Sequence, residues 1–185
     1  MPSRDRRAVR PERKQLTKGE ASQEKSGDEY PKCYEAALHY IEYRPRSEAE
    51  VRRHLMFKRR FTDESVSRAV AKLKKLKLID DTTFSEMWAR ERVSHRHKSS
   101  LMIKRELMQK GVDGTIIERV TGHINDEANA LRAGMSKARH LKDLDYPEFY
   151  KRLAAYLGRK GYGSELVRRV VVRLWESRKD DVTAK

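Results

Sequence analysis

Hydrophobic and polar residues follow one another along much of the chain at the spacing of amphipathic helices. In residues 66–76 the apolar positions lie three, four, seven and ten residues after the first, and basic residues fall between them. This spacing predicts a helix with one face for a core and the other for solvent or a partner. The apolar positions are Val66, Ala69, Val70, Leu73 and Leu76, and the basic ones are Arg68, Lys72 and Lys75.

The same apolar pattern occurs three times along the chain. Each copy starts at a leucine, reaches an aromatic residue or a valine, and continues as an apolar stripe at helical spacing. The second of these positions is occupied by Phe61, Val112 and Tyr162, at spacings of 51 and 50 residues. Repeats of this length have room for three short helices. Because one such unit buries little apolar surface alone, stacking of the units into an elongated, curved solenoid is expected.

The repeats predict an all-α fold of three tandem three-helix repeats. Residues 31–80, 81–125 and 126–180 are expected to form the repeats. Residues 1–30 are expected to be a disordered, charged tail, because they contain proline, glycine and many charged residues but few apolar ones. The first helices of the three units are expected at about 33–43, 83–93 and 126–141.

Helix start and stop signals agree with this division. Ser47 and Glu50 have the spacing of a capping box. Gly111 and Gly161 fall where the middle helix of a unit must turn sharply into the third. Further caps are expected at Asp63, Asp113, Asp145 and either Asp80 or Asp81.

The charge balance favours nucleic acid or an acidic protein surface as a partner. The 185 residues include 43 Lys and Arg against 28 Asp and Glu, which gives a formal net charge of +15. Such a charge attracts polyanions. The charged fraction of 38% disfavours a doubly wound α/β enzyme, whose elements are buried on both faces. A single cysteine, Cys33, and the lack of a long apolar run predict a cytoplasmic protein without a disulfide or a membrane segment.

Three motifs resemble reactive or ligand-binding sites, but each lacks a necessary part. Asp80 and Asp81 have no further carboxylates nearby at helical spacing, and His95 and His97 have no third metal ligand. Residues 158–164 lack the preceding strand and the Gly-Lys-Ser/Thr ending of a phosphate-binding loop. The sequence therefore predicts no catalytic residue, no metal site and no cofactor, and a protein that is not an enzyme.

Several separated motifs resemble the RecX family of recombinase regulators. They are Tyr43-Arg44-Pro45-Arg46-Ser47-Glu48, Leu78-Ile79-Asp80-Asp81 with Phe84, Trp88 and Arg92, Glu106-Leu107 before Lys110-Gly111-Val112, and Leu157 with Lys160-Gly161-Tyr162. The resemblance covers residues 33–177 and implies three tandem three-helix repeats. It also implies a protein that binds the RecA recombinase filament on DNA, lies in its helical groove, and inhibits ATP hydrolysis and strand exchange. Such a protein regulates recombination, DNA repair and the SOS response without enzymatic activity of its own.

Two stretches depart from the family's pattern. Arg59-Arg60-Phe61 stands where the family has Lys-Gly-aromatic, and it carries one residue more than the other two copies. The glycine-rich stretch expected before the middle helix of the second unit is replaced by the basic segment 95–100. Both turns are therefore expected to differ locally from the family's pattern.

Basic residues on the predicted helices form the candidate partner surface. If the second helix runs unbroken from Glu48 to about Arg60, four arginines and Met56 share one face. Basic residues of the other units are expected to extend this surface. The candidates for contact with a partner or DNA are Arg52, Arg53, Arg59, Arg60, Lys104, Arg105, Arg168, Arg169 and Arg173. Any one of them also fits an ordinary solvated helix face.

The sequence leaves three functions open. The first is a monomeric modulator of a recombinase filament, with single- or double-stranded DNA as a further partner and no membrane contact. The alternative is a general DNA-binding helical protein that needs no recombinase and reads duplex DNA with helix-turn-helix units. The third is a scaffold for acidic proteins. Binding of duplex DNA by the protein alone, with a steep salt dependence, distinguishes the second function from the others.

Overall fold

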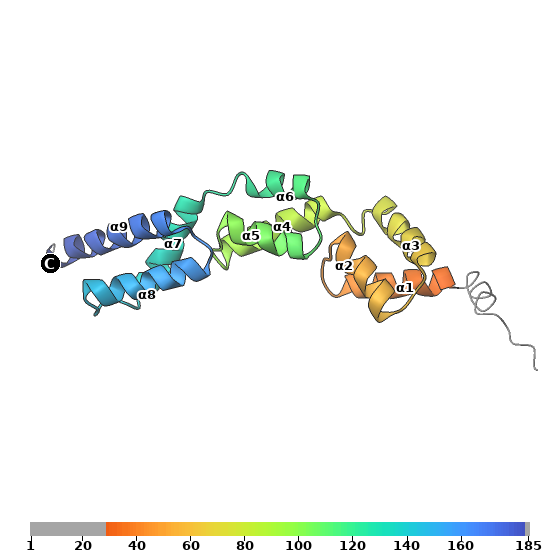
Figure 1. The fold of residues 1–185 in the computed structure, drawn as a ribbon, viewed down its shortest axis with the longest axis horizontal. Coiled ribbons are helices and arrows are strands. Elements are labelled where there is room, and N and C mark those ends of the chain that lie inside the picture. Colours follow the sequence, from red (N-terminus) through yellow and green to blue (C-terminus); the bar gives the residue numbers. More distant parts are fainter. Residues whose placement is uncertain (1–28, 184–185) are drawn as a thin grey trace, which may run out of the picture.

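Residues 29–183, which the computed structural model describes, form three helical units arranged in a row with no β-strand among them (Figure 1). Unit one contains α1 (Glu29–Glu42), α2 (Glu48–Arg53), the π-helical segment η2 (His54–Lys58) and α3 (Asp63–Lys75). Unit two contains α4 (Asp81–Ser94), α5 (Ser100–Gln109) and α6 (Gly114–Thr121). Unit three contains α7 (Asp126–Ala138), α8 (Tyr146–Arg159) and α9 (Ser164–Thr183).

This arrangement confirms the predicted all-α fold of three tandem three-helix repeats and its elongated shape (Figure 1). The helix α1 begins at Glu29, within the stretch that was predicted to be a tail. The earlier residues of that predicted tail lie outside the described part of the chain. The exact division at residues 31, 81 and 126 stays a prediction.

Each unit has its own hydrophobic core. Three separate clusters of buried apolar residues are present, one per unit, and each lies between the helices of that unit. The expectation that a unit needs its neighbours to bury its apolar stripes is therefore wrong. The residues at the centres of the cores are Val51, Leu55 and Leu73 in unit one, Ile103, Leu107 and Ile117 in unit two, and Phe149, Leu153 and Leu157 in unit three.

Polar side chains fix the helix starts largely as the sequence predicts. The Ser47 hydroxyl accepts from the Glu50 N–H, and the Glu50 carboxylate accepts from the Ser47 N–H, which completes the capping box. The predicted caps at Asp80, Asp113 and Asp145 are also present. The cap of α3 is Thr62, so the prediction of Asp63 is wrong. Asp63 lies in the first turn, where a negative charge is favoured by the helix dipole.

The middle helix of unit one changes from α to π geometry at His54. The hydrogen bond that closes this helix runs from the Phe61 N–H to the Leu55 carbonyl, whereas unit two uses Val112 and Leu107, one residue closer together. A π-helical turn adds one residue to a helix while both ends keep their contacts. It thus absorbs the extra residue of unit one. The expectation of an unbroken α-helix from Glu48 to about Arg60 is wrong.

The turns after the three middle helices share one backbone conformation. Arg60, Gly111 and Gly161 have φ values of 59°, 75° and 92°, in the left-handed region. A Cβ atom on Gly111 would lie 2.4 Å from the Ala49 Cβ atom of unit one, and one on Gly161 would lie 2.5 Å from the Ser99 hydroxyl of unit two. Glycine is required at these two turns because each packs closely on the preceding unit. Arg60 is exposed and no described unit precedes it.

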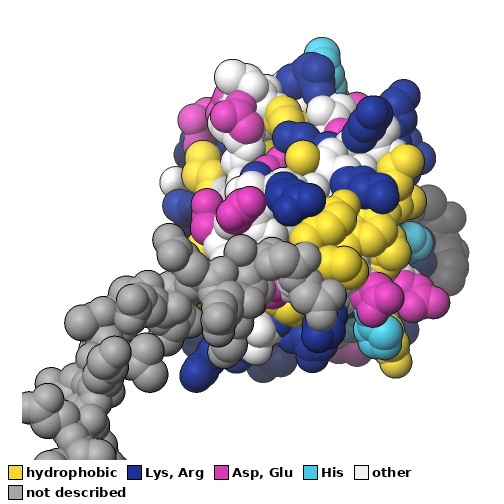
Figure 2. Space-filling model, turned by 90° about the vertical axis from the view of Figure 1, so that its right-hand side faces the viewer, with side chains coloured by type: hydrophobic (Ala, Val, Ile, Leu, Met, Phe, Trp, Pro, Cys, Tyr) yellow, Lys and Arg dark blue, Asp and Glu magenta, His cyan; other side chains and the backbone are white. Residues whose placement is uncertain are grey.

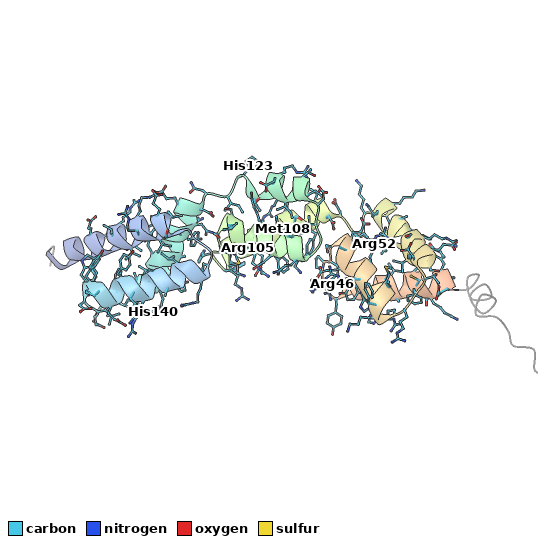
Figure 3. The ribbon with its side chains drawn as sticks, viewed as in Figure 1. Arg46, Arg52, Arg105, Met108, His123 and His140 are labelled. Carbon is cyan, nitrogen blue, oxygen red and sulfur yellow. The ribbon has the colours of Figure 1, made fainter. Side chains whose placement is uncertain are left out.

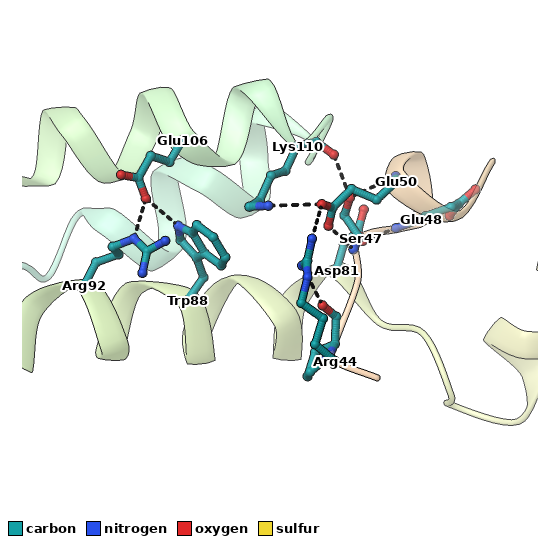
Figure 4. A network of polar contacts seen from close by, with 10 residues as sticks. Arg44, Ser47, Glu48, Glu50, Asp81, Trp88, Arg92, Glu106 and Lys110 are labelled. Atoms are coloured by element: carbon teal, nitrogen blue, oxygen red, sulfur yellow. Dashed lines mark hydrogen bonds and ion pairs between the residues drawn. The ribbon is translucent and has the colours of Figure 1, made fainter. Parts of the chain in front are cut away.

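The joint between units one and two is made by hydrogen bonds at helix ends (Figure 4). The Ser47 hydroxyl donates to the Lys110 carbonyl at 2.6 Å, so the cap of α2 contacts the turn after α5. The Glu48 N–H donates to the Asp81 carboxylate at 2.8 Å, so the first helix of unit two caps the same helix end. Two elements of unit two therefore hold one helix N-terminus of unit one.

The joint between units two and three repeats this arrangement. The Ser99 N–H donates to the Lys160 carbonyl at 3.0 Å, and the Ser100 N–H donates to the Asp126 carboxylate at 2.8 Å. At the first joint the end of α5 thus meets the start of α2, and at the second the end of α8 meets the start of α5. This places the middle helices head to tail and produces the elongated row of Figure 1.

Candidate partner-binding surfaces

A half-buried polar cluster in unit two connects α4 to α5 (Figure 4). The Glu106 carboxylate accepts hydrogen bonds from Trp88 Nε1 at 2.8 Å, from Arg92 Nε at 2.6 Å, and from Lys98 Nζ. Burial alone would raise the pKa of Glu106, but these hydrogen bonds outweigh it and hold the pKa below its ordinary value. The sequence motifs contain three of these residues, but they gave no sign that Glu106 is the shared acceptor.

Lys110, in the turn after α5, extends this polar cluster to the joint between units one and two. Lys110 Nζ lies 3.1 Å from a Glu50 carboxylate oxygen and 4.1 Å from the centre of the Trp88 ring. Arg44 also pairs with Glu50 at 3.1 Å. Burial would raise the pKa of Glu50, but hydrogen bonds from Lys110, Ser47 and Arg44 lower it. These groups hold units one and two together. Because their charges are paired with one another, they leave little charge free for a partner.

The predicted basic face of unit one is divided in the structure. Arg52 pairs with Glu48 at 2.9 Å and donates to the Ser67 hydroxyl of α3. Arg59 follows η2 and lies beside α1 instead, in a recess lined partly by Tyr40. Met56 packs against the core of unit one. The prediction that these residues share one face is wrong, because the π-helical turn and the left-handed turn at Arg60 redirect the chain. Arg53, Arg59 and Arg60 are exposed.

The predicted basic residues of units two and three lie on helices and are mostly exposed. Lys104 is half-buried and pairs with Glu118, whereas Arg105 on the same helix is exposed (Figure 3). On α9, Arg168, Arg169 and Arg173 line one shallow hollow. Arg169 also pairs with Glu165 at 2.8 Å. The structure therefore brings together the three arginines of unit three, and it separates them from those of unit one along the length of the molecule.

The outer end of unit one combines aromatic and basic side chains. Figure 2 looks onto this end and shows hydrophobic side chains exposed beside lysine and arginine side chains. Tyr30 and Tyr34 of α1 lie with their ring centres 6.1 Å apart. The Arg68 guanidinium lies 4.6 Å from the centre of the Tyr30 ring, and the Lys72 ammonium lies 4.9 Å from that of Tyr34. The rings attract these two exposed cations, which remain open to an anionic partner.

Within residues 29–183, no three His, Cys, Asp or Glu side chains gather closely enough to hold a metal ion. His95 and His97 lie in the turn before α5, where the His97 ring contacts the Val93 carbonyl. None of the described helices has the length and apolar character needed to span a membrane. The side chain of Cys33 lies in the core of unit one, where burial, with a contribution from Glu29, raises the thiol pKa to about 11.

Comparison with family models matches each unit separately. Residues 33–73 match the first three-helix domain of RecX, residues 80–120 match the second, and residues 125–171 match the third. Together these matches cover more than half of the chain and follow the order of the units in the structure.

Comparison with curated proteins gives relatives named regulatory protein RecX. The protein from Mycobacterium tuberculosis is 33% identical over 142 residues, which cover 73% of this chain and 81% of that protein. The protein from Oceanobacillus iheyensis is 30% identical over 150 residues, which cover 80% of this chain but 55% of that longer protein. The protein from Chlorobium phaeobacteroides is 28% identical over 146 residues, which cover 79% of this chain and 95% of that protein.

Solved structures share the fold. The crystal structure of RecX from Lactobacillus salivarius superposes with a TM-score of 0.68 at 24% identity, over 80% of this chain and 97% of that one. Another RecX regulatory protein gives a TM-score of 0.66 at 20% identity, over 84% of this chain and 78% of that one.

The three tandem helical units and their distributed basic residues define an elongated helical-repeat protein, a class that binds partners along an extended surface. The matched domains and relatives then specify the family. This chain belongs to the RecX family of regulatory proteins.

Proposed function

We propose that this protein binds the filament of a RecA-type recombinase on DNA, lies in the helical groove of that filament, and inhibits its ATPase and strand-exchange activities. The observation that supports this most is the row of three units with separate cores, because an elongated protein can contact several subunits of a filament at once (Figure 1). The net charge of +15 favours a partner that carries DNA. Such a filament forms in the cytoplasm, so this protein acts there. It binds the filament as a monomer.

Multivalent contact explains how modest contacts give firm binding. Once one unit binds, the other two are held near their own sites at high effective concentration. Exposed arginines are available on all three units, among them Arg53, Arg105 and Arg173. A protein that bridges filament subunits in this way opposes the subunit movements coupled to ATP hydrolysis and blocks the groove to a second DNA.

Titration of the purified protein into recombinase, ATP and single-stranded DNA tests this function. Phosphate release is expected to fall as the protein is added, because bridged subunits cannot complete the ATPase cycle. Unchanged phosphate release at saturating protein would refute the proposal. Binding to duplex DNA without recombinase, at an affinity equal to that for the filament, would support a general DNA-binding protein instead.

Reversing charge on α9 tests which surface meets the filament. Arg168 and Arg173 are exposed residues around one hollow, so Arg168→Glu with Arg173→Glu removes two adjacent positive charges without touching the core. We expect filament affinity to fall about tenfold or more at 0.1 M salt, with helicity by circular dichroism unchanged. The matched control is Arg139→Glu with Lys142→Glu, an equal charge change at exposed residues before α8. Equal losses in the two double variants would show that α9 makes no specific contact.

A further inference from the structure

Unit one contains a basic recess with no acidic side chain in its lining within residues 29–183. The recess has a volume of about 370 Å³ and lies between the second half of α1, the loop after it, and η2 with the residue that follows it. Arg46, His54 and Arg59 contribute basic groups, and no aspartate or glutamate of the described chain is among its lining residues. Ala36, Tyr40 and Tyr43 also line it.

Comparison of unit one with unit two shows what is missing from this recess. The capping serines Ser47 and Ser99 lie 52 residues apart, and the same offset relates the buried core residues Leu55 and Leu107. At this offset His54 corresponds to Glu106, and Arg46 corresponds to Lys98. Unit two thus has a carboxylate where unit one has an imidazole.

Two further positions increase the difference between unit one and unit two. Tyr40 corresponds to Arg92, and Ala36 corresponds to Trp88, at the same offset. In unit two, the indole, guanidinium and ammonium groups all donate to the Glu106 carboxylate. In unit one, the change from tryptophan to Ala36 opens space, and the change from carboxylate to imidazole removes the internal anion. The recess is therefore the counterpart of the anion position of unit two, without the built-in anion.

The basic groups of the recess are incompletely satisfied. The Arg46 Nε atom is buried and has no hydrogen-bond partner within residues 29–183. The Arg46 guanidinium instead lies 4.1 Å from the centre of the Tyr40 ring, which stacks on His54 at 3.8 Å. Burial and then the nearby charges of Arg59, Arg46 and Lys58 lower the pKa of His54, consistent with a local excess of positive charge. By contrast, the neighbouring Arg44 and Arg52 both have carboxylate partners.

An exposed aromatic ring lies at the edge of the recess. Tyr43 is 88% exposed, the largest exposed fraction among the large hydrophobic side chains of the described residues, and it lines the recess beside the basic groups. Exposure of this ring costs hydration free energy unless a partner covers it. Proteins that bind single strands combine such exposed rings, on which bases stack, with cations that hold the phosphates. Duplex DNA keeps its bases stacked inside and offers none to such a ring.

We propose that this recess binds single-stranded nucleic acid, with a backbone phosphate held by Arg46 and Arg59 beside His54, the counterpart of Glu106, and with an adjacent base stacked on Tyr43. The site deepens the proposed function, since a recombinase filament forms on single-stranded DNA. It operates without recombinase, so its test is separate from the ATPase titration.

Fluorescence anisotropy of a fluorescein-labelled 15-nucleotide oligo-dT with the full chain measures this site directly. Tyr43→Ala is expected to weaken binding about tenfold, because it removes one stacked base, whereas Tyr43→Phe keeps affinity within about twofold. Arg59→Gln is expected to reduce the slope of log affinity against log salt by about 0.7, the value for one phosphate contact on a single strand. A labelled 15-base-pair duplex is expected to bind more weakly and to be insensitive to Tyr43→Ala.

Installing the carboxylate of unit two gives the sharpest test. His54→Glu places an internal anion beside Arg46 and is expected to weaken oligo-dT binding at least about tenfold at pH 7.5, while the melting temperature is kept or raised. His54→Gln has no charge and is expected to keep affinity within about threefold. Arg139→Gln, which removes one positive charge from an exposed position in unit three, is the charge-matched control.

Three results would overturn the proposal. One is a loss for His54→Glu no larger than that for Arg139→Gln. Another is duplex binding as tight as single-strand binding, with Tyr43→Ala without effect. The third is complete displacement of oligo-dT by poly-glutamate, equally strong for wild type and Tyr43→Ala. This result would identify an acidic protein as the occupant.

Discussion

Gly111→Ala is expected to lower the free energy of unfolding by about 3 kcal/mol and to loosen the joint between units one and two. The left-handed φ of 75° costs a non-glycine residue about 1–2 kcal/mol. In addition, the new Cβ atom would lie 2.4 Å from the Ala49 Cβ atom on α2, so the turn after α5 and α2 must separate. Urea unfolding followed by circular dichroism measures the loss.

A second glycine provides the control for this substitution. Gly158 lies inside α8, and a Cβ atom there would have no neighbour within 4 Å. Gly158→Ala is therefore expected to stabilise the protein by roughly 0.5–1 kcal/mol through the higher helix propensity of alanine. If Gly111→Ala lowered the free energy of unfolding no more than Gly158→Ala does, this would contradict the close packing of the turn on α2.

Glu106→Gln is expected to destabilise unit two by about 2–3 kcal/mol at pH 7. The substitution keeps the shape of the side chain but removes the charge that Arg92 and Lys98 share, and the new amide group brings N–H donors towards other donors. Trp88 reports the change directly, because its indole N–H donates to the same carboxylate. In a Trp175→Phe background, its fluorescence during urea unfolding measures both the local environment and the stability.

The effect of Glu106→Gln is expected to depend on pH. Because the pKa of Glu106 is lowered in the folded protein, its charge contributes stability that is fully present above the unfolded value of about 4.5. That contribution is lost as the pH falls through the lower, folded pKa. The stability difference between wild type and Glu106→Gln should therefore shrink below about pH 4.5. A difference that stayed constant down to pH 3 would contradict the assigned role of this carboxylate.

The repeat pattern predicted the fold well because each apolar stripe is local. Val66, Val70 and Leu73 define a helix face from spacing alone, and their burial follows. Caps were also predictable where one side chain serves its own helix, as at Ser47 and Asp113. The cap at Thr62 was missed because an aspartate follows it directly and both residues fit the cap position.

The candidate surface was harder to predict, because it depends on one inserted residue and on contacts between distant segments. The extra residue before Phe61 was visible in the sequence, but its conversion into a π-helical turn separates Arg52 from Arg59. Either Asp80 or Asp81 was expected to cap α4. Asp80 does so, whereas Asp81 accepts the Glu48 N–H across the joint, 33 positions away. Pairings of this kind leave no periodic signal. The correspondence of His54 with Glu106 was available from the repeat register, and it becomes informative once the partners of Glu106 are known.

Separate cores joined by polar helix ends also determine how this protein responds to a destabilising substitution. A large core defect, such as a truncated Leu153, removes contacts within unit three and leaves the apolar packing of the other two units intact. The stability of the protein is therefore made of three local terms coupled through the joints, and a single melting temperature reports them together. Such modularity allows sequence drift in one repeat while the other two keep their shape.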